Sequence, residues 1–400
     1  MIINLTTPET IKSIDLGVST PKLGGVVDIT RFTDLENFVS FTGVQGNDIE
    51  NFILPNPNVN LKKVWLSYNK LTGSANQYIP QNVVDFQIQN NLLNAPLSNL
   101  LIFDKLEVMR LDKNLNMGGG IPTLPGSIRV FNANTCSLTG PIPNLNNNTN
   151  LVTFICFSNN LTGQIPNLDL NIKLDTFICR SNNLTGSIPL INNPKLRFFY
   201  CHDNQLTGSI PNLDNLPEMA FYYCYDNQLT GSIPSLANLP KLQHLKCFKN
   251  NITGNIPSIS NNNELRQLEI YENQITGSIP SLAVGPNYNL NNFKASKNQL
   301  TGTIPSLTLN QNLKTFECSD NQLTDFTTSS LSAVTRFIAQ NNQLTTAAVD
   351  KILQALATAS TSPVSGTANL AGTNSSPTGG NSNSDKLVLE ARGWSVTVAL

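Results

Sequence analysis

The sequence predicts a solenoid, a fold in which one short structural unit is repeated and stacked along an axis. The phrase NQLTGSIPSL (227–236) occurs in seven variants between residues 159 and 307. Each variant follows a run such as LVTFICFS (151–158), in which inward and outward positions alternate as in a strand with one buried face. Because a unit of this length cannot bury its apolar side alone, we expect about fourteen stacked turns that share one long parallel sheet.

The repeat at 151–161 shows how each turn is expected to fold. Its alternation places four side chains inside, those of Leu151, Phe154, Cys156 and Leu161. In the GxIPxL segment that follows, glycine permits a tight bend and proline fixes the backbone where no sheet N–H is needed. The isoleucine and leucine of that segment are predicted to point inward from the opposite side.

An asparagine is expected to turn the chain at the end of each strand, where its amide satisfies backbone groups that the buried turn would leave unpaired. Stacked turns would align these asparagines as a ladder, with Cys136 in place of one of them. The ladder positions, 21 to 25 residues apart, are Asn47, Asn69, Asn91, Asn114, Cys136, Asn159, Asn182, Asn204, Asn227, Asn250, Asn273, Asn298, Asn321 and Asn342.

The resulting consensus, LxxLxLxxNxLTGxIPxL, resembles the leucine-rich repeat, and its second half resembles the repeat type of plant receptors. The resemblance implies a concave parallel sheet, an irregular convex side and a general role in recognition without catalysis. Plant receptors of this type carry paired cysteines in their end caps. This chain has none there.

Three regions are predicted along the chain. Residues 1–38 form an N-terminal cap or an attachment segment, residues 39–344 form the solenoid, and residues 345–400 form a cap. The solenoid holds a two-residue insertion within 281–290. In the cap we expect helices at 345–360 and 384–394 and paired strands at 366–372 and 394–400. The order VDKILQAL, GTANLAGT, PTGG, LEARGWSVTV resembles a tail of phage structural proteins and of some bacterial surface repeat proteins.

Composition argues against several functional classes. The net charge is −1 and charged residues make up 13% of the chain, so a basic face for nucleic acid or anionic lipid is not expected. No apolar run approaches the roughly 20 residues that cross a bilayer, and the first residues do not resemble a secretory signal. Six of the seven cysteines share one repeat position and are predicted to be buried free thiols: Cys156, Cys179, Cys201, Cys224, Cys247 and Cys318.

No catalytic constellation is predicted. The two histidines, His202 and His244, fall two turns apart in different outward columns, and Asp203 and Asp226 are expected to be solvated carboxylates. No CxxC or Cys/His spacing indicates a metal site. The sequence therefore predicts a protein without enzymatic activity, cofactor or metal.

Aromatic and cationic residues gather at outward positions in the middle of the solenoid. Read two residues before the ladder position, the middle turns carry Phe157, Arg180, His202, Tyr225, Phe248 and Tyr271. The neighbouring column adds Tyr200 and Tyr223, and the next adds Phe198 and Phe221. Exposed aromatics grouped on a sheet favour a ligand site for sugars or peptide side chains. The alternative is that the rings only stabilise the sheet by stacking.

The leading interpretation of the whole sequence is a phage virion component. It would be a tail fibre, adhesin or decoration protein that binds a host-surface glycan or protein and contacts other virion proteins. Virion proteins leave by lysis without a signal, and they fold in a reducing cytoplasm that suits free cysteines. A bacterial surface or secreted interaction protein and a purely architectural virion subunit are the alternatives. No nucleic acid partner or membrane insertion is expected, and assembly into a homo-oligomer is left open.

Overall fold

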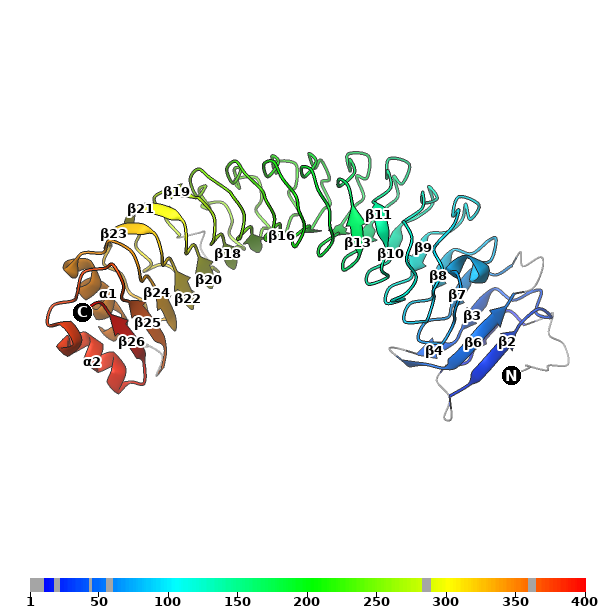
Figure 1. Ribbon diagram of the computed structural model, residues 1–400, viewed down its shortest axis with the longest axis horizontal. Helices are drawn as coiled ribbons and strands as arrows, with labels where there is room; N and C mark the ends of the chain where they lie inside the picture. Colours follow the sequence, from blue (N-terminus) through cyan, green and yellow to red (C-terminus); the bar gives the residue numbers. More distant parts are fainter. Residues whose placement is uncertain (1–10, 18–21, 43–44, 55–59, 283–288, 359–364) are drawn as a thin grey trace. The chain divides into compact units, whose positions relative to one another are not determined.

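The computed structural model describes residues 11–17, 22–42, 45–54, 60–282, 289–358 and 365–400. The chain divides into two compact units, Met1–Leu196 and Arg197–Leu400. Within each unit the strands of the main parallel sheet lie on one side, and the turns lie on the other (Figure 1). This arrangement confirms the predicted solenoid. The expected insertion falls largely in 283–288, outside the described residues.

Unit 1 is built on short parallel strands, one for each turn. Its main sheet contains β1 (Ser13–Asp15), β3 (Asn37–Val39), β7 (Lys63–Trp65), β8 (Asp85–Gln87), β9 (Val108–Arg110), β10 (Val130–Asn132), β12 (Thr153–Ile155) and β14 (Thr176–Ile178). The strands keep one register, so that Val130 lies opposite Thr153 and Thr153 opposite Thr176. Side chains at the same repeat position therefore form columns across the sheet.

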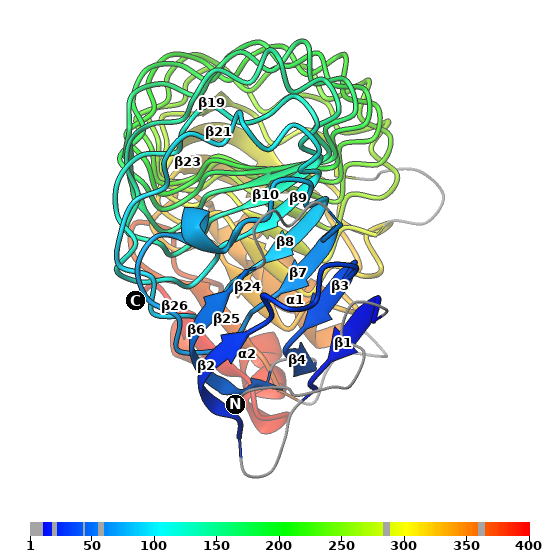
Figure 2. The ribbon, with the colours of Figure 1, turned by 90° about the vertical axis from the view of Figure 1, so that its right-hand side faces the viewer.

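Smaller elements complete unit 1 around its main sheet (Figure 2). At the N-terminal end, β2 (Gly24–Asp28) pairs in parallel with β6 (Asp48–Ile53), and β4 (Phe41–Thr42) pairs antiparallel with β5 (Gln45–Gly46). On the turn side, β11 (Thr139–Pro141) pairs with β13 (Asn160–Thr162), and the 3-10 helix η2 covers Ala75–Tyr78.

Unit 2 repeats the same plan and adds a helical end. Its main sheet contains β15 (Phe198–Tyr200), β16 (Phe221–Tyr223), β17 (His244–Lys246), β18 (Gln267–Glu269), β20 (Asn292–Lys294), β22 (Thr315–Glu317), β24 (Arg336–Ile338), β25 (Thr367–Leu370) and β26 (Ser395–Val398). A second small sheet contains β19 (Thr276–Gly277), β21 (Gln299–Ile304) and β23 (Gln322–Phe326).

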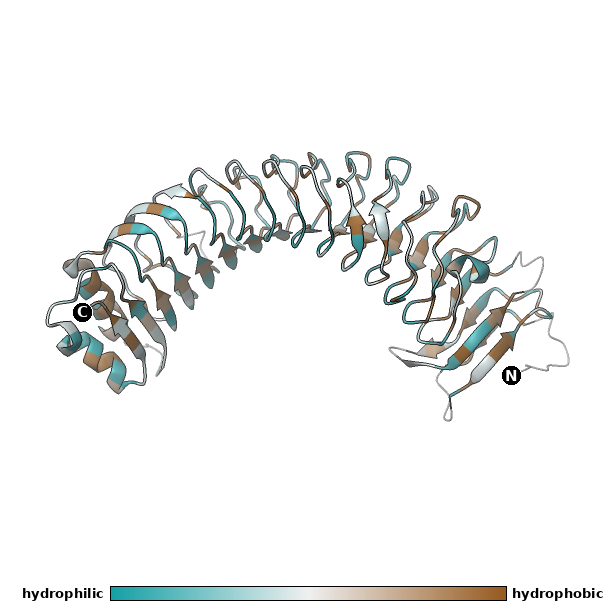
Figure 3. Cartoon of the chain, in the orientation of Figure 1, coloured by the Kyte–Doolittle hydropathy of each residue, from teal (hydrophilic) through white to brown (hydrophobic). Residues whose placement is uncertain are grey.

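The core of each unit is made of side chains that occupy the same repeat position in successive turns and stack in columns. In unit 1 the rings of Phe131, Phe154 and Phe177 stack with centroids 5.5 and 5.4 Å apart. In unit 2, Phe293 and Phe316 repeat this contact at 5.2 Å. All seven cysteines are buried free thiols, as predicted. Hydrophobic residues recur at matching places in successive turns (Figure 3).

The asparagine ladder forms as expected. In Asn250 the amide oxygen accepts a hydrogen bond from Leu229 N at 2.9 Å, and Nδ2 donates to the carbonyls of Cys224, Cys247 and Phe248. The same contacts recur at Asn159, Asn182, Asn227, Asn273, Asn298 and Asn321. The Nδ2 of Asn204 likewise donates to the carbonyls of Cys201 and His202.

One substitution and one extension of the ladder are informative. The Sγ of Cys136 lies 3.3 Å from the carbonyl oxygens of Leu111 and Asn134, so a thiol donor replaces the amide donor. Beyond the last predicted position, Asn374 of the cap donates to Ala339 and Leu370 and accepts from Leu344 N. The ladder therefore continues into the C-terminal cap.

A second buried asparagine column lies on the turn side and was not predicted. Its described members are Asn148, Asn171, Asn193, Asn262 and Asn310. The Nδ2 of Asn171, for example, donates to the carbonyls of Leu145 and Asn148, one turn earlier. These asparagines pair backbone carbonyls where the chain bends without a strand partner.

The residue before the ladder position is left-handed in every turn from Tyr68 to Asn341, although none is glycine. The φ angle at this position lies between 52° at Lys249 and 61° at Lys113. The sharp turn that buries the ladder amide imposes this conformation on whatever residue is present.

The C-terminal end of unit 2 is closed by helices α1 (Thr346–Thr358) and α2 (Ser384–Ala391), with a 3-10 helix, η3 (Gly380–Ser382), before α2. The apolar stripe of α1, which includes Val349, Ile352 and Leu353, is fully buried. Arg392 Nη1 donates to the carbonyl of Ala357 at 2.7 Å and ties the end of α2 to the end of α1.

Candidate functional site

The strand face of unit 2, formed by outward side chains of its main sheet, carries a group of nine rings. This aromatic cluster contains Phe198, Tyr200, His202, Phe221, Tyr223, Tyr225, His244, Phe248 and Tyr271. The cluster forms because three outward positions of each turn are aromatic in neighbouring turns, and the strands are in register.

The first column of the cluster is a continuous stack of four rings. The ring centroids of His202 and Tyr225 are 4.1 Å apart, and those of Tyr225, Phe248 and Tyr271 follow at 4.3 Å steps. The last three rings are within 10° of parallel. Each inner ring thus has both faces covered by its neighbours and presents an edge to the outside.

The second and third columns pack beside this stack. Tyr200 stacks on Tyr223 at 4.6 Å, and Phe198 stacks on Phe221 at 5.3 Å. His244 extends the third column, and its Nδ1 lies 2.7 Å from the hydroxyl oxygen of Tyr223 in a hydrogen bond between the columns. The three columns therefore make one connected surface.

Burial within the cluster changes its ionisation. Desolvation, with Lys246 and Arg266 nearby, lowers the pKa of His244 from 6.5 to about 4, so the ring is neutral at pH 7. Desolvation and the carboxylates of Glu269 and Glu272 raise the pKa of Tyr271 to about 12. The hydroxyls of the cluster are therefore protonated donors at neutral pH.

His202 corrects one part of the sequence prediction. It was expected as an exposed member of the ligand face, but it is only 5% exposed. The ring of Tyr225 covers it at 4.1 Å, and Tyr200 and Tyr223 lie about 6 Å away. His202 therefore supports the cluster from within. The other predicted members of unit 2, Tyr200, Tyr223, Tyr225, Phe248 and Tyr271, are half-buried at the surface.

The remaining predicted site residues belong to unit 1. Arg180 lies over the ring of Phe157, with its guanidinium carbon 4.1 Å from the ring centroid. The structure thus brings these two together and groups the other six in unit 2.

Unit 1 also presents Trp65 on its strand face, a residue that sequence analysis missed. Its Nε1 donates to Asp85 at 2.9 Å, and Lys63 Nζ lies 3.5 Å from its ring centroid. Trp65 occupies the same repeat position as Tyr200 and Tyr223, so reading this column from the first turns onward could have found it.

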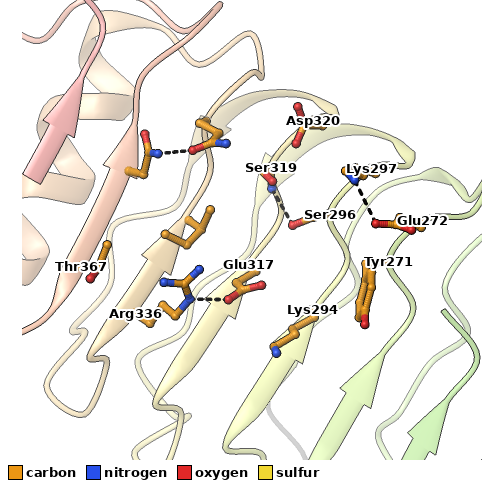
Figure 4. A pocket seen from close by; sticks show the side chains of 13 residues that line it. Tyr271, Glu272, Lys294, Ser296, Lys297, Glu317, Ser319, Asp320, Arg336 and Thr367 are labelled. Atoms are coloured by element: carbon orange, nitrogen blue, oxygen red, sulfur yellow. Dashed lines mark hydrogen bonds and ion pairs between the residues drawn. The ribbon is translucent and has the colours of Figure 1, made fainter. Parts of the chain in front are cut away.

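A polar pocket of about 510 Å³ lies on the strand face of unit 2, beside the end of the four-ring stack (Figure 4). Tyr271 forms one of its walls. Glu317 and Arg336, on the neighbouring strands β22 and β24, form an ion pair that lines it, and Lys297 pairs with Glu272 at 2.9 Å. Lys294 of β20 also lines this pocket. Sequence analysis missed this pocket because its charged residues, scattered over four turns, gave no local motif.

A smaller pocket of about 270 Å³ lies at the opposite edge of the cluster, beside Phe198 and Phe221. Arg197 lies over the Phe198 ring at 5.1 Å, and Glu218 pairs with Lys241 at 2.6 Å. The aromatic cluster is thus flanked on the strand face of unit 2 by two charged hollows.

The described ranges lack two further features. No group of three His, Cys, Asp or Glu side chains among them could hold a metal ion. None of the helices in those ranges has the length and apolarity of a membrane span.

Comparison with known proteins identifies the fold. No family model and no curated protein matches the chain. Among solved structures, the Arabidopsis receptor kinase HAESA, in complex with the peptide hormone IDA and the co-receptor SERK1, is 22% identical with a TM-score of 0.71. That match covers 92% of this chain and 67% of the receptor chain.

Two bacterial structures are similar as well. The functional domain of InlJ from Listeria monocytogenes, which includes a cysteine ladder, is 18% identical with a TM-score of 0.61, over 84% of this chain and 74% of that chain. YopM from Yersinia enterocolitica is 22% identical with a TM-score of 0.55, over 76% and 61%.

Proposed function

We infer that the strand faces of this solenoid, which has the leucine-rich repeat fold of the solved structures above, serve recognition. We propose that the chain is a non-catalytic recognition protein that binds its partner through the aromatic cluster of unit 2. The observation that carries the proposal is the grouping of nine rings on one sheet face, flanked by two charged pockets. Clustered aromatic residues with polar rims are typical of interfaces.

The alternative, that the rings only stabilise the sheet, explains less of the surface. Stacking explains why the faces of the outward rings are covered. Buried ring columns such as Phe131 to Phe177, however, already stabilise the sheet from inside the solenoid. The outward columns use tyrosine at four of nine positions, and tyrosine combines a large contact area with a hydroxyl that can bond a ligand. A purely structural stack needs no such hydroxyls.

The similar structures support a recognition role. HAESA was solved with the peptide hormone IDA, and PEPR1 was solved with AtPEP1. In this chain, we propose a partner on a cell surface, a glycan or a protein.

The proposed setting is a phage virion, in which the chain would be a tail fibre, adhesin or decoration protein. The support is the C-terminal order of helix, GTANLAGT, PTGG and LEARGWSVTV, together with seven free thiols that suit folding in a reducing cytoplasm. The second candidate is a bacterial surface or secreted interaction protein, which the likeness to InlJ and YopM favours. A third is an architectural virion subunit whose cluster packs on a neighbouring protein.

The recognition proposal is tested with the double variant Tyr225→Ala/Phe248→Ala. Fluorescently labelled protein is incubated with cells of the source culture, and bound label is measured by flow cytometry. We expect binding to fall at least tenfold, because removing two rings breaks the four-ring stack. The control is Phe157→Ala, which lies at the same repeat position in unit 1. Equal binding by the double variant and the unaltered protein would contradict the proposal.

The setting is tested by mass spectrometry of density-purified virus particles and washed cells from the same culture. Peptides of this chain at fixed stoichiometry to a capsid protein would support the virion proposal. Peptides found only with washed cells would support the bacterial surface alternative instead.

A further inference from the structure

The four-ring stack on unit 2 ends at Tyr271, and no ring among the described residues stacks on the second face of this tyrosine. Phe248 covers the other face at 4.3 Å, with the two planes 9° apart. Beyond Tyr271 the same column continues with Ser296 and Ser319. Their side chains are too short to reach the ring, so the stack stops and the polar pocket begins (Figure 4).

The step from tyrosine to serine leaves a slot of defined shape. Strands in a sheet are about 4.8 Å apart, close to the 4.3 Å ring spacing of the stack. A flat group placed over Ser296 would therefore continue the stack as its next layer. The pocket volume of about 510 Å³ is sufficient for one six-membered ring with its substituents.

The walls of the slot are polar on every side except that of Tyr271 and Ile338. Glu317 and Arg336 supply an acceptor and donors from β22 and β24. Lys294 adds an ammonium group from β20, and Ser319 adds a hydroxyl from the stack column. A ligand that fits must present one apolar face toward Tyr271 and hydrogen-bonding groups around its rim.

A pyranose ring has this combination, because its axial C–H groups form an apolar face and its hydroxyls form a polar rim. Each hydroxyl both donates and accepts, which matches a wall that holds a carboxylate beside a guanidinium. An aromatic side chain of a protein partner would match Tyr271 equally well. It would, however, offer no hydroxyls to the hydrogen-bonding capacity that Glu317, Arg336 and Lys294 retain beyond their ion pairs, and that capacity would be buried in the interface.

We propose that the pocket beside Tyr271 is a carbohydrate subsite that stacks one hexopyranose unit on the open face of the tyrosine ring. Lys294, Glu317 and Arg336 bind its hydroxyls. The assignment rests on the proposed recognition function and names the ligand class for that surface. The aromatic cluster would then hold the rest of the glycan or the surface that carries it.

The test uses saturation-transfer NMR with the methyl glycosides of glucose, galactose, mannose and N-acetylglucosamine, each at millimolar concentration. We expect at least one glycoside to give signals, strongest from the C–H protons of one ring face. Tyr271→Ala should abolish them. Ser296→Tyr should abolish them as well, because a fifth ring would fill the slot while the stack remains intact. Phe157→Ala, in unit 1, should leave them unchanged.

Tyr271→Ala could lose binding only because the ring stack loosens, whereas Ser296→Tyr retains the stack and fills the slot. Circular dichroism and the thermal midpoint show whether each variant is folded. Absence of signals from all four glycosides would overturn the carbohydrate assignment. Signals from N-acetyltyrosine amide that Ser296→Tyr removes, without glycoside signals, would also overturn it and assign the slot to an aromatic side chain.

The failure of this proposal is distinguishable from that of the recognition function. Cell binding that is lost in Tyr225→Ala/Phe248→Ala but retained in Ser296→Tyr, with no glycoside signal, overturns the subsite and leaves the recognition surface standing. Glycoside signals that are lost in Ser296→Tyr support the subsite. They do so even if Tyr225→Ala/Phe248→Ala binds cells as well as the unaltered protein, a result that would contradict the recognition proposal alone.

Discussion

The two asparagine columns of unit 2 differ in what their amide oxygens contact. In Asn250 both ends of the amide are used, because Oδ1 accepts from Leu229 N and Nδ2 donates to three carbonyls. In Asn262 only Nδ2 is paired, with the carbonyls of Leu236 and Leu239, both at 2.9 Å. A ladder asparagine such as Asn250 therefore pairs more backbone groups than an asparagine of the second column such as Asn262.

We expect Asn250→Ala to lower the free energy of unfolding by about 3 kcal/mol, since it leaves a buried backbone N–H without an acceptor. Asn262→Ala should cost about 1 kcal/mol, because it removes an unpaired buried oxygen together with the donor. Urea unfolding followed by circular dichroism measures both. Equal losses in the two variants would show that the ladder acceptor has no special weight.

The ionisation of His244 gives a second prediction at the residue scale. Burial lowers the pKa of the folded ring to about 4, below its ordinary value of 6.5. As the pH falls, the unfolded chain therefore takes up a proton first. The stabilisation from neutral His244 is fully present above pH 6.5 and is lost as the pH falls through 4.

NMR titration of the His244 Cε1–H signal should give a midpoint near pH 4. His244→Gln should remove the part of the acid destabilisation that develops between pH 6.5 and 4. The assigned signal of the same ring in urea-unfolded protein is the control and should titrate near 6.5. A native midpoint near 6.5 would mean that water reaches the ring despite the Tyr223 contact.

Single residues also show where sequence reasoning reached its limit. Membership of the aromatic cluster could be predicted because outward positions of in-register parallel strands align by repeat number alone. The burial of His202 could not, since it depends on the size and tilt of the three tyrosine rings around it. The pocket beside Tyr271 likewise depends on how Glu317 and Arg336 orient across neighbouring strands.

At the scale of one repeat, the residue before each ladder position has the same left-handed backbone conformation in successive turns. Its side chain differs from turn to turn. Serine, aspartate, lysine and asparagine all occupy it, and at Thr135 it is a β-branched residue with φ 55°. β-Branched residues are the least suited to this conformation, whereas asparagine is among the best. The sequence could not reveal the strain because the position has no fixed residue type.

Thr135→Asn is therefore expected to raise the free energy of unfolding by about 1 kcal/mol, because asparagine tolerates the left-handed conformation. The midpoint of urea unfolding measures the gain. Thr149→Asn, at an exposed position in the next turn, is the matched control and should stay within about 0.5 kcal/mol of the unaltered protein. A lower midpoint for Thr135→Asn would show that the hydrogen bond from Thr135 Oγ1 to Asn134 Oδ1 outweighs the backbone strain.

Across the whole molecule, repetition decides which parts were predictable. The strand positions, the ladder and the thiol column follow from periodicity, and the structure has them at the expected residues. The second asparagine column escaped prediction because its spacing is interrupted: proline at 125 and leucine at 239 occupy the same repeat position as Asn148 and Asn262. Features that are not repeated, such as the Glu317–Arg336 ion pair in unit 2, carry no periodic signal at all.

The thiols give a prediction that tests both units at once. Cys136, Cys156 and Cys179 lie in unit 1, and Cys201, Cys224, Cys247 and Cys318 lie in unit 2, all buried and free. Burial raises the pKa of the Cys247 thiol to about 12, so almost no reactive thiolate is present at pH 7. A disulfide reagent should therefore modify none of the seven in the native protein over an hour, and all seven in 8 M urea.

Mass spectrometry after a short alkylation pulse at intermediate urea extends this experiment to the two units. Because each thiol sits in a column that is exposed only when its turns open, modification should appear in groups rather than one thiol at a time. Species carrying three labels would report the opening of unit 1, and species carrying four would report unit 2. Rapid single labelling in the absence of urea would contradict the burial of the thiol column, and with it the close packing of the turns on which both strand faces depend.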